Sequence, residues 1–161
     1  MWGEDVFRLQ LALQELGLKA MDVTGYFGPA TKAAVQRLQQ AVGLQPDGVV
    51  GPATRRVLEG LQRAYRHRVQ PGDNLWDLAR RFGTTMESLM DANDLNTTTL
   101  RPGQELVIPS VRLLYVPAAT RLADLARRLG VPLRSLLELN NLKEANTVAA
   151  GSEIWIPLPR F

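Results

Sequence analysis

Hydrophobic residues recur every three or four positions in the first third of the chain, a spacing that predicts short amphipathic helices. The first helix has four apolar residues on one face: Val6, Leu9, Leu13 and Leu16. Two further helices begin at the repeated Gly-Pro-Ala-Thr segments, residues 28–31 and 51–54, because proline is tolerated at the first helical position. Residues 1–63 are therefore predicted to form a domain of three helices that share one buried face.

A different pattern covers residues 64–110 and is repeated, in a diverged form, in residues 111–161. Each copy has an extended run, a turn, two small amphipathic helices and a second strand-like run, which the first copy closes at Pro109. The apolar positions of the first helix recur in both copies: Leu75, Leu78, Ala79 and Phe82, then Leu122, Leu125, Ala126 and Leu129. The chain is thus predicted to be α+β, mainly α, with a three-helix domain followed by two βααβ domains.

Local signals add detail to the first βααβ copy. Thr84 and Glu87 have the spacing of a capping box, which predicts the start of its second helix. Residues 65–69 are interpreted as a linker between the first two domains, so we expect the single histidine, His67, to have no functional partner. The arginines in and beside this segment are expected to be solvated: Arg63, Arg66 and Arg68.

Two tryptophans lie off the apolar faces of their predicted elements. Trp76 is not on the face that carries Leu75 and Leu78, and Trp155 alternates with the isoleucines of the last strand. Aromatic rings also stack on sugars, but we expect both indoles to pack between neighbouring domains.

Composition argues against several classes of function. The formal charge of +3 is not accompanied by a clustered basic surface, so a nucleic-acid partner is not expected. No apolar run is long enough to cross a bilayer, and the acidic start of the chain shows no signal peptide. With no cysteine and one histidine, the sequence offers neither a thiol nor an imidazole metal site, and no cofactor is expected.

Catalytic residues are also not expected. None of the four serines lies in a Gly-x-Ser-x-Gly turn: Ser88, Ser110, Ser135 and Ser152. Glycoside cleavage needs two carboxylates, but the acidic residues of the first βααβ copy fall at predicted caps, helix surfaces and loops. The sequence therefore predicts a protein that is not an enzyme.

The first βααβ copy resembles a LysM domain, a small carbohydrate-binding module. The resemblance is carried by residues 69–79, Asn93 with Leu95, and residues 100–109. It implies a sugar groove between two loops that contain Gly72, Asp73, Asn74 and Leu75 on one side and Asn93, Asp94, Leu95 and Asn96 on the other. The matching positions of the diverged second copy are weaker candidates: Ala119, Thr120, Arg121, Leu122, Asn140, Asn141, Leu142 and Lys143.

These candidates have structural alternatives. In the alternative interpretation, Gly72 only supplies a turn conformation and Asp73 only caps a helix. Asn93 then only holds its loop by local hydrogen bonds. Leu75 and Leu122 are more often core residues than ligand contacts.

Residues 6–61 resemble the three-helix peptidoglycan-binding domain. The match includes residues 25–31 and 47–54, while Thr24 stands where that family usually has aspartate. Tyr26 and Phe27 lie on the first of these loops. We expect one of them to be a core residue and the other to line a glycan or peptide groove.

Together the resemblances imply non-catalytic binding of N-acetylglucosamine-containing wall polysaccharide. Peptidoglycan is favoured over chitin because the three-helix family is associated with it, and a chito-oligosaccharide is the expected soluble ligand. The expected location is a bacterial cell wall, a spore envelope or the extracellular surface, with a hydrolase domain attached or associated. The alternatives are a wall hydrolase, or its targeting part, and an envelope scaffold that binds proteins and no glycan.

Overall fold

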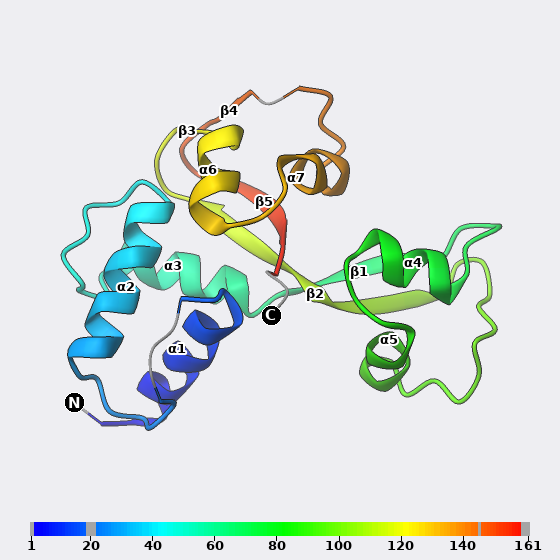
Figure 1. Cartoon of the computed structure of the whole chain (residues 1–161), viewed down its shortest axis with the longest axis horizontal. Helices are drawn as coiled ribbons and strands as arrows, with labels where there is room; N and C mark the ends of the chain where they lie inside the picture. The colour runs from blue at the N-terminus through cyan, green and yellow to red at the C-terminus, as the bar shows by residue number, and fades with distance from the viewer. Residues whose placement is uncertain (1, 19–21, 145, 159–161) are drawn as a thin grey trace.

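The computed structural model of the chain describes residues 2–18, 22–144 and 146–158 (Figure 1). Its helices are α1 (Glu4–Glu15), α2 (Pro29–Ala41), α3 (Pro52–Leu61), α4 (Leu75–Arg81), α5 (Met86–Ala92), α6 (Leu122–Leu129) and α7 (Leu133–Leu139). Its strands are β1 (Ala64–Arg68), β2 (Glu105–Val116), β3 (Thr120–Arg121), β4 (Thr147–Val148) and β5 (Ser152–Pro157). The predicted α+β class, mainly α, is confirmed.

Three groups of elements are visible in Figure 1. The N-terminal unit consists of α1, α2 and α3. The middle unit consists of β1, α4, α5 and the first half of β2, and it projects to the right. The C-terminal unit consists of the second half of β2 with β3, α6, α7, β4 and β5, and it lies beside the N-terminal unit.

Two buried glutamines hold the loops of the N-terminal unit. The Gln10 side chain donates to the Tyr26 carbonyl at 2.9 Å and accepts from the Gly25 N–H at 2.8 Å. Gln39 makes the same pair of bonds in the second repeat, to the Val49 carbonyl and from the Gly48 N–H, both at 2.9 Å. Each amide satisfies backbone groups of a Gly-containing turn, which explains why the sequence repeat is also a structural repeat.

Thr24 replaces aspartate in the first of these turns without loss of the turn hydrogen bond. Its hydroxyl accepts from the Tyr26 N–H at 3.2 Å. Asp47 accepts from the Val49 N–H at 2.8 Å in the second turn. The substitution therefore keeps the local geometry and removes a negative charge.

Strand β2 is longer than predicted and belongs to two units. It pairs with β1 through its first half and with β5 through its second half, in an antiparallel sheet of order β1-β2-β5. The predicted end at Pro109 is wrong, because the register shifts there: Tyr65 pairs with Ile108, and Ala64 pairs with Arg112. Proline is tolerated at such an irregularity because no ladder hydrogen bond requires its missing N–H.

The apolar residues form two cores. One lies within the middle unit and is built on Leu75, Leu78, Phe82, Leu106 and Ile108. The other joins helices of the N-terminal unit to α6, α7 and β5, so those two units share one core. The middle unit is therefore attached to the other two units mainly through the β-sheet.

Two predictions about the middle unit are wrong. Residues 64–68 form strand β1, so the predicted linker is part of the sheet, and His67 is 6% exposed. The cap of α5 is Thr85, which accepts from the Ser88 N–H, and not Thr84 with Glu87. The true cap lies one residue later because Thr84 still completes the turn after α4, through its N–H to the Ala79 carbonyl.

The two tryptophans have different surroundings. Trp155 packs on the middle core with its ring 5.1 Å from that of Tyr65, so its predicted role between units is confirmed. Trp76 is 57% exposed, and its ring faces the Arg80 guanidinium at 5.5 Å. Packing between units is therefore wrong for Trp76.

Helix α3 lies close to the backbone of β2 at Gly60. A Cβ atom at this position would be 3.0 Å from the Leu113 carbonyl oxygen. We expect Gly60→Val to lower the free energy of unfolding by about 1–3 kcal/mol, because the added atoms force α3 away from the shared core. Urea unfolding measures the change. Gly51→Val, at the N-cap position just before the same helix, where a Cβ atom meets nothing within 4 Å, is the control and is expected to cost under about 1 kcal/mol.

Candidate functional site

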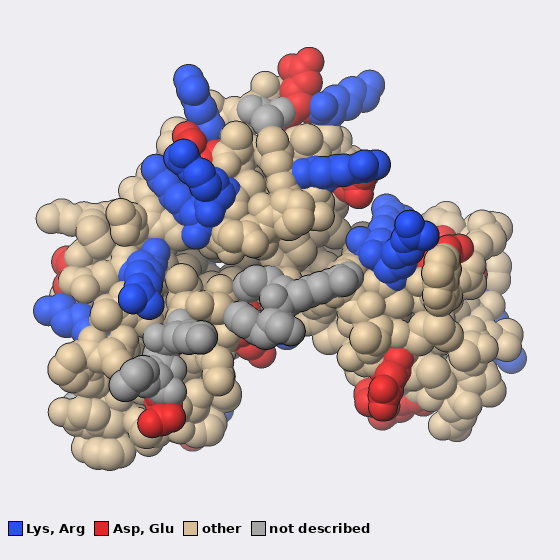
Figure 2. All heavy atoms as spheres, in the orientation of Figure 1, with Lys and Arg blue, Asp and Glu red and all other residues tan. Residues whose placement is uncertain are grey.

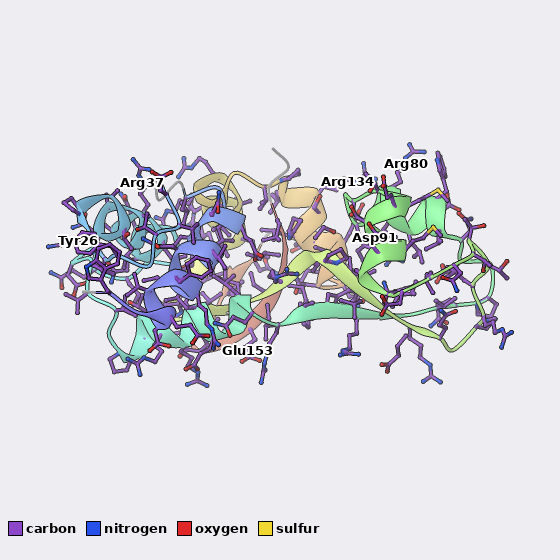
Figure 3. All side chains as sticks on the ribbon, turned by 90° about the horizontal axis from the view of Figure 1, so that it is seen from below. Tyr26, Arg37, Arg80, Asp91, Arg134 and Glu153 are labelled. Atoms are coloured by element: carbon purple, nitrogen blue, oxygen red, sulfur yellow. The ribbon has the colours of Figure 1, made fainter. Side chains whose placement is uncertain are left out.

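The two loops predicted to form a sugar groove lie at the outer end of the middle unit. Figures 1 and 3 both place this end far from the N-terminal helices. Gly72, Asn74, Asp94 and Asn96 are exposed there, while Leu95 is half-buried. Leu75 is buried in the core beneath them, as its structural alternative predicted. The loops are open to solvent and to a long ligand.

The backbone of both loops is held in uncommon conformations. Gly72 has φ of +90° and Asp94 has φ of +51°, both in the left-handed region. The first turn closes through the Asp73 N–H to the Gln70 carbonyl at 3.0 Å. Glycine is needed at position 72, and aspartate is one of the few other residues that adopt this region readily.

Asp73 is turned inward toward His67. Its Oδ2 lies 2.8 Å from His67 Nε2 and accepts from the Gln70 N–H at 2.8 Å. The cap of α4 is Asn74, whose side chain accepts from the Asp77 N–H at 2.9 Å, so the helix-cap alternative for Asp73 is wrong. The Gln70 N–H, and next the His67 side chain, hold the pKa of Asp73 below its ordinary value.

This lowered pKa makes the first loop sensitive to acid. A carboxyl whose pKa is lower in the folded state contributes stability above its unfolded pKa, near 3.8, and loses it as the pH falls through the folded pKa. Between about pH 4 and pH 2, the unfolding free energy of the native protein should therefore fall more steeply than that of Asp73→Asn. Urea unfolding across this range measures both slopes. Parallel slopes would show that the carboxylate is not specially stabilised.

Asn93 connects helix α5 to strand β2. Its side-chain nitrogen donates to the Leu89 carbonyl at 2.8 Å and to the Val107 carbonyl at 2.9 Å, and its oxygen accepts from the Val107 N–H at 2.7 Å. The bonds to Val107 extend beyond the local loop that the structural alternative described. Asn93 therefore fixes the position of the second loop.

Asn140 makes the same three bonds in the C-terminal unit, to the Leu136 carbonyl and to both backbone groups of Trp155. The predicted equivalence of the two asparagines is thus confirmed.

The corresponding loops of the C-terminal unit are bridged to each other. Strands β3 and β4 pair Thr120 with Val148 and Arg121 with Thr147, and the Leu122 N–H bonds to the Asn146 carbonyl at 3.1 Å. Among the described residues, the middle unit has no such ladder between its two loops. In the C-terminal unit, backbone hydrogen bonds therefore tie the first loop to the segment that precedes β5.

The first loop of the C-terminal unit is also covered from outside. Thr120 is 7% exposed and its hydroxyl donates to the Ala118 carbonyl. A Cβ atom at Gly43, just after α2, would be 3.3 Å from the Ala118 side chain. Leu122 is buried, whereas Arg121, Asn141, Leu142 and Lys143 are exposed. The structure thus does not bring these candidates into one open groove.

In the N-terminal unit, Phe27 packs against the shared core and Tyr26 is 42% exposed, in keeping with the expectation that one of them is a core residue. The Tyr26 ring lies 4.7 Å from that of Trp2, which is exposed. Figure 3 shows Tyr26 at the opposite end of the molecule from Arg80. These aromatic rings are therefore remote from the loops of the middle unit.

Sequence reasoning missed an open hollow beside the second loop of the middle unit. It has a volume of about 490 Å³ and is lined by Thr99, Arg101 and Gln104. The Arg101 N–H donates to the Gln104 side chain, which shapes the turn. The Pro-Gly dipeptide at 102–103 was the available sequence signal for this turn.

Within the ranges that the structure describes, no helix is long and apolar enough to cross a membrane. The same residues contain no group of three or more His, Cys, Asp or Glu side chains that would hold a metal ion.

Two family models match the chain in series. The model described as "Putative peptidoglycan binding domain" matches residues 3–58, and the LysM domain model matches residues 67–109 and 122–157. The chain is a peptidoglycan-binding domain followed by two LysM domains. The middle unit contains the first LysM domain, and the C-terminal unit contains the second. These families are binding modules and not catalytic domains, and they support peptidoglycan binding.

Several proteins are similar to parts of this chain. An "Uncharacterized protein in bpoA1 3'region" of Kitasatospora aureofaciens is 53% identical over 30% of this chain and 42% of its own length. The "Putative sporulation-specific glycosylase YdhD" of Bacillus subtilis (strain 168) is 36% identical over 56% of this chain and 21% of its own. The "Probable autolysin SsaALP" of Staphylococcus aureus (strain NCTC 8325 / PS 47) is 34% identical over 29% and 18%. The chain thus spans less than half the length of these relatives.

Proposed function

We propose that this chain binds N-acetylglucosamine-containing wall polysaccharide, with peptidoglycan as the natural polymer, and that it does so without chemical change. The single observation that carries the proposal is the open pair of loops at the free end of the first LysM domain. A shallow surface with exposed backbone groups suits a sugar, which offers hydroxyl and acetamide groups to several weak hydrogen bonds.

Within this site, the proposed contacts are the exposed turn at Gly72 and Asn74 and the exposed side chains of Asp94 and Asn96, with Leu95 as the apolar contact. Asp73 and Asn93 support the two loops from the inner side of the domain. Their polar atoms already bond His67 and Val107, so they hold the two loops at a fixed separation. Loops that are already held in place avoid the ordering cost that a flexible loop has on binding.

We propose a different role for the second LysM domain. Its loops are bridged by β3 and β4, and its core is continuous with that of the N-terminal unit. It therefore serves as a rigid base from which the first LysM domain projects. The proposed domain ranges remain 1–63, 64–110 and 111–161, with β2 as the strand that the last two domains share.

The wider role is targeting to the wall. Two proteins that are similar to part of this chain are named a putative sporulation-specific glycosylase and a probable autolysin. We propose that this chain directs a wall hydrolase, attached or associated, to a cell wall or spore envelope. Binding at more than one point on a repetitive polymer would raise the effective affinity well above that of one site.

Sedimentation with insoluble peptidoglycan tests the proposal. The protein should pellet with the polymer and be released by soluble chito-oligosaccharide, and no reducing sugar should appear in the supernatant. Asn96→Ala should reduce the pelleted fraction, and Asn141→Ala, at an exposed loop position of the second LysM domain, is its matched control. Failure to pellet would contradict glycan binding, and release of sugar would contradict a purely binding role.

A further inference from the structure

A cleft of about 380 Å³ lies between the two LysM domains, away from the sugar loops. Its walls are the ends of α4 and α6, which are equivalent in the two copies and turn at Gly83 and Gly130. The volume is within the range of small-ligand sites. Figure 2 shows a notch between the upper and right-hand lobes, with Lys and Arg atoms on both sides of it and Asp or Glu atoms beside those of the upper lobe.

The charged side chains that line the cleft are arginines. Arg80 and Arg81 form one wall, Ser135 lies on the other, and no acidic residue is among the lining residues of the cleft. In the described part of the chain neither arginine forms an ion pair. Arg80 lies over the Trp76 ring and Arg81 over the Phe82 ring, at 5.5 and 5.3 Å. Both guanidinium groups therefore lie against aromatic faces, and the charge of Arg81 also helps to lower the pKa of Asp73, so Arg80 is the less engaged of the two toward an anion.

The equivalent arginines of the second LysM domain provide a contrast. Arg127 corresponds to Arg80, and it forms an ion pair with Asp124 at 3.0 Å. In the first LysM domain the equivalent carboxylate, Asp77, instead accepts a hydrogen bond from the Asn74 side chain. The Asn74 cap engages Asp77, and Arg80 forms no ion pair among the described residues, whereas its equivalent Arg127, which does not line the cleft, is paired.

The rest of the cleft is apolar. Its floor is formed by side chains from both LysM domains: Phe82, Val131, Pro132, Leu139, Pro157 and Leu158. The Phe82 carbonyl, which would repel an anion, accepts a hydrogen bond from the Ser110 hydroxyl at 2.8 Å. Paired arginines beside an aliphatic floor suit a ligand that carries a carboxylate and small alkyl groups.

We propose that this cleft binds the carboxylate end of a short aliphatic peptide, of the kind that peptidoglycan carries on its glycan strand. This inference rests on the proposed function, because it assigns a second part of the same polymer to a second site. The sugar loops lie at the outer end of the first LysM domain, and the cleft lies at its inner side. One strand and its attached peptide would then contact both surfaces.

Titration by NMR with N-acetyl-alanyl-alanine of D configuration tests the proposal, with the C-terminal amide of the same dipeptide as the comparison. The dipeptide with a free carboxylate should shift the backbone amide resonances of Gly130 and Ser135. The dipeptide with a C-terminal amide should bind at least about fivefold more weakly, because it cannot form the two hydrogen bonds between arginine and a carboxylate. The double variant Arg80→Gln/Arg81→Gln should lose this preference. Arg127→Gln/Arg128→Gln, with the same charge change at equivalent positions outside the cleft, should keep it.

Each other outcome overturns the proposal. These are no shift at Gly130 and Ser135, equal binding of the two dipeptides, or loss of binding in both double variants. Inorganic phosphate that binds as tightly as the dipeptide, with the same dependence on Arg80 and Arg81, would show an unspecific anion site. Chito-oligosaccharide titrated into the same samples separates the two claims: sugar binding without peptide binding refutes only the cleft, and the reverse refutes only the sugar site.

Discussion

Asn93→Ala should lower the free energy of unfolding by about 3 kcal/mol, because three hydrogen bonds to the backbone of α5 and β2 are lost at about 1 kcal/mol each. The Val107 N–H and C=O would also lose their partners in a partly buried site. Urea unfolding at neutral pH measures the loss. The same change at Asn140 removes the equivalent bonds and should cost a similar amount.

Asn96→Ala is the control for this prediction. Asn96 is exposed on the same loop, and its replacement should change the unfolding free energy by under about 0.5 kcal/mol. A change of this small size in Asn93→Ala would show that the three bonds do not hold the loop. If the prediction is correct, loss of glycan binding in Asn93→Ala reports loss of structure and not loss of a sugar contact.

Asp73→Ala should lower the unfolding free energy by about 1–3 kcal/mol, since it leaves buried His67 and the Gln70 N–H without their shared acceptor. The second LysM domain shows how the same position is filled without charge. There, Leu114 takes the place of His67 and Thr120 takes the place of Asp73, and both are buried.

The double variant His67→Leu/Asp73→Thr copies that pair into the first LysM domain. It should regain more than half of the stability that Asp73→Ala loses, because neither new residue leaves a buried donor unpaired. Urea midpoints of the two variants and the native protein give the comparison. A double variant as unstable as Asp73→Ala would show that the pair does not act as a unit.

Much of the fold could be predicted from the sequence because short signals decide it. Pro29 and Pro52 mark the starts of α2 and α3, and both are at the first helical position. Periodic leucines identify the buried faces of α4 and α6. The match of the copies, with one residue added to the second loop of the second copy, places Asn93 and Asn140 at equivalent positions.

The features that were missed depend on contacts between distant residues. Pro109 ends a strand in most contexts, but here a register shift lets β2 continue into the next unit. His67 has no partner within five residues, and its contact with Asp73 forms only after the turn at Gly72 folds back. The β3–β4 ladder joins residues 26 or more apart, and single-sequence patterns do not predict such pairings.

The candidate site was predicted to the level of loops and not of side chains. The resemblance to LysM domains gave the two loops, and the structure shows them exposed at one end of the first LysM domain. The resemblance could not distinguish exposed Asn74 and Asn96 from Asp73 and Asn93, whose polar atoms form hydrogen bonds within the fold. Residue type alone does not tell which asparagine faces solvent.

An NMR titration of the whole chain with chito-oligosaccharide tests directly whether the first LysM domain binds sugar without cleaving it. We expect the largest amide shifts at Gly72, Asn74 and residues 94–96, no change at residues 119–122 and 140–144, and recovery of the intact sugar. Shifts centred on the second LysM domain, or cleavage of the sugar, would contradict this expectation.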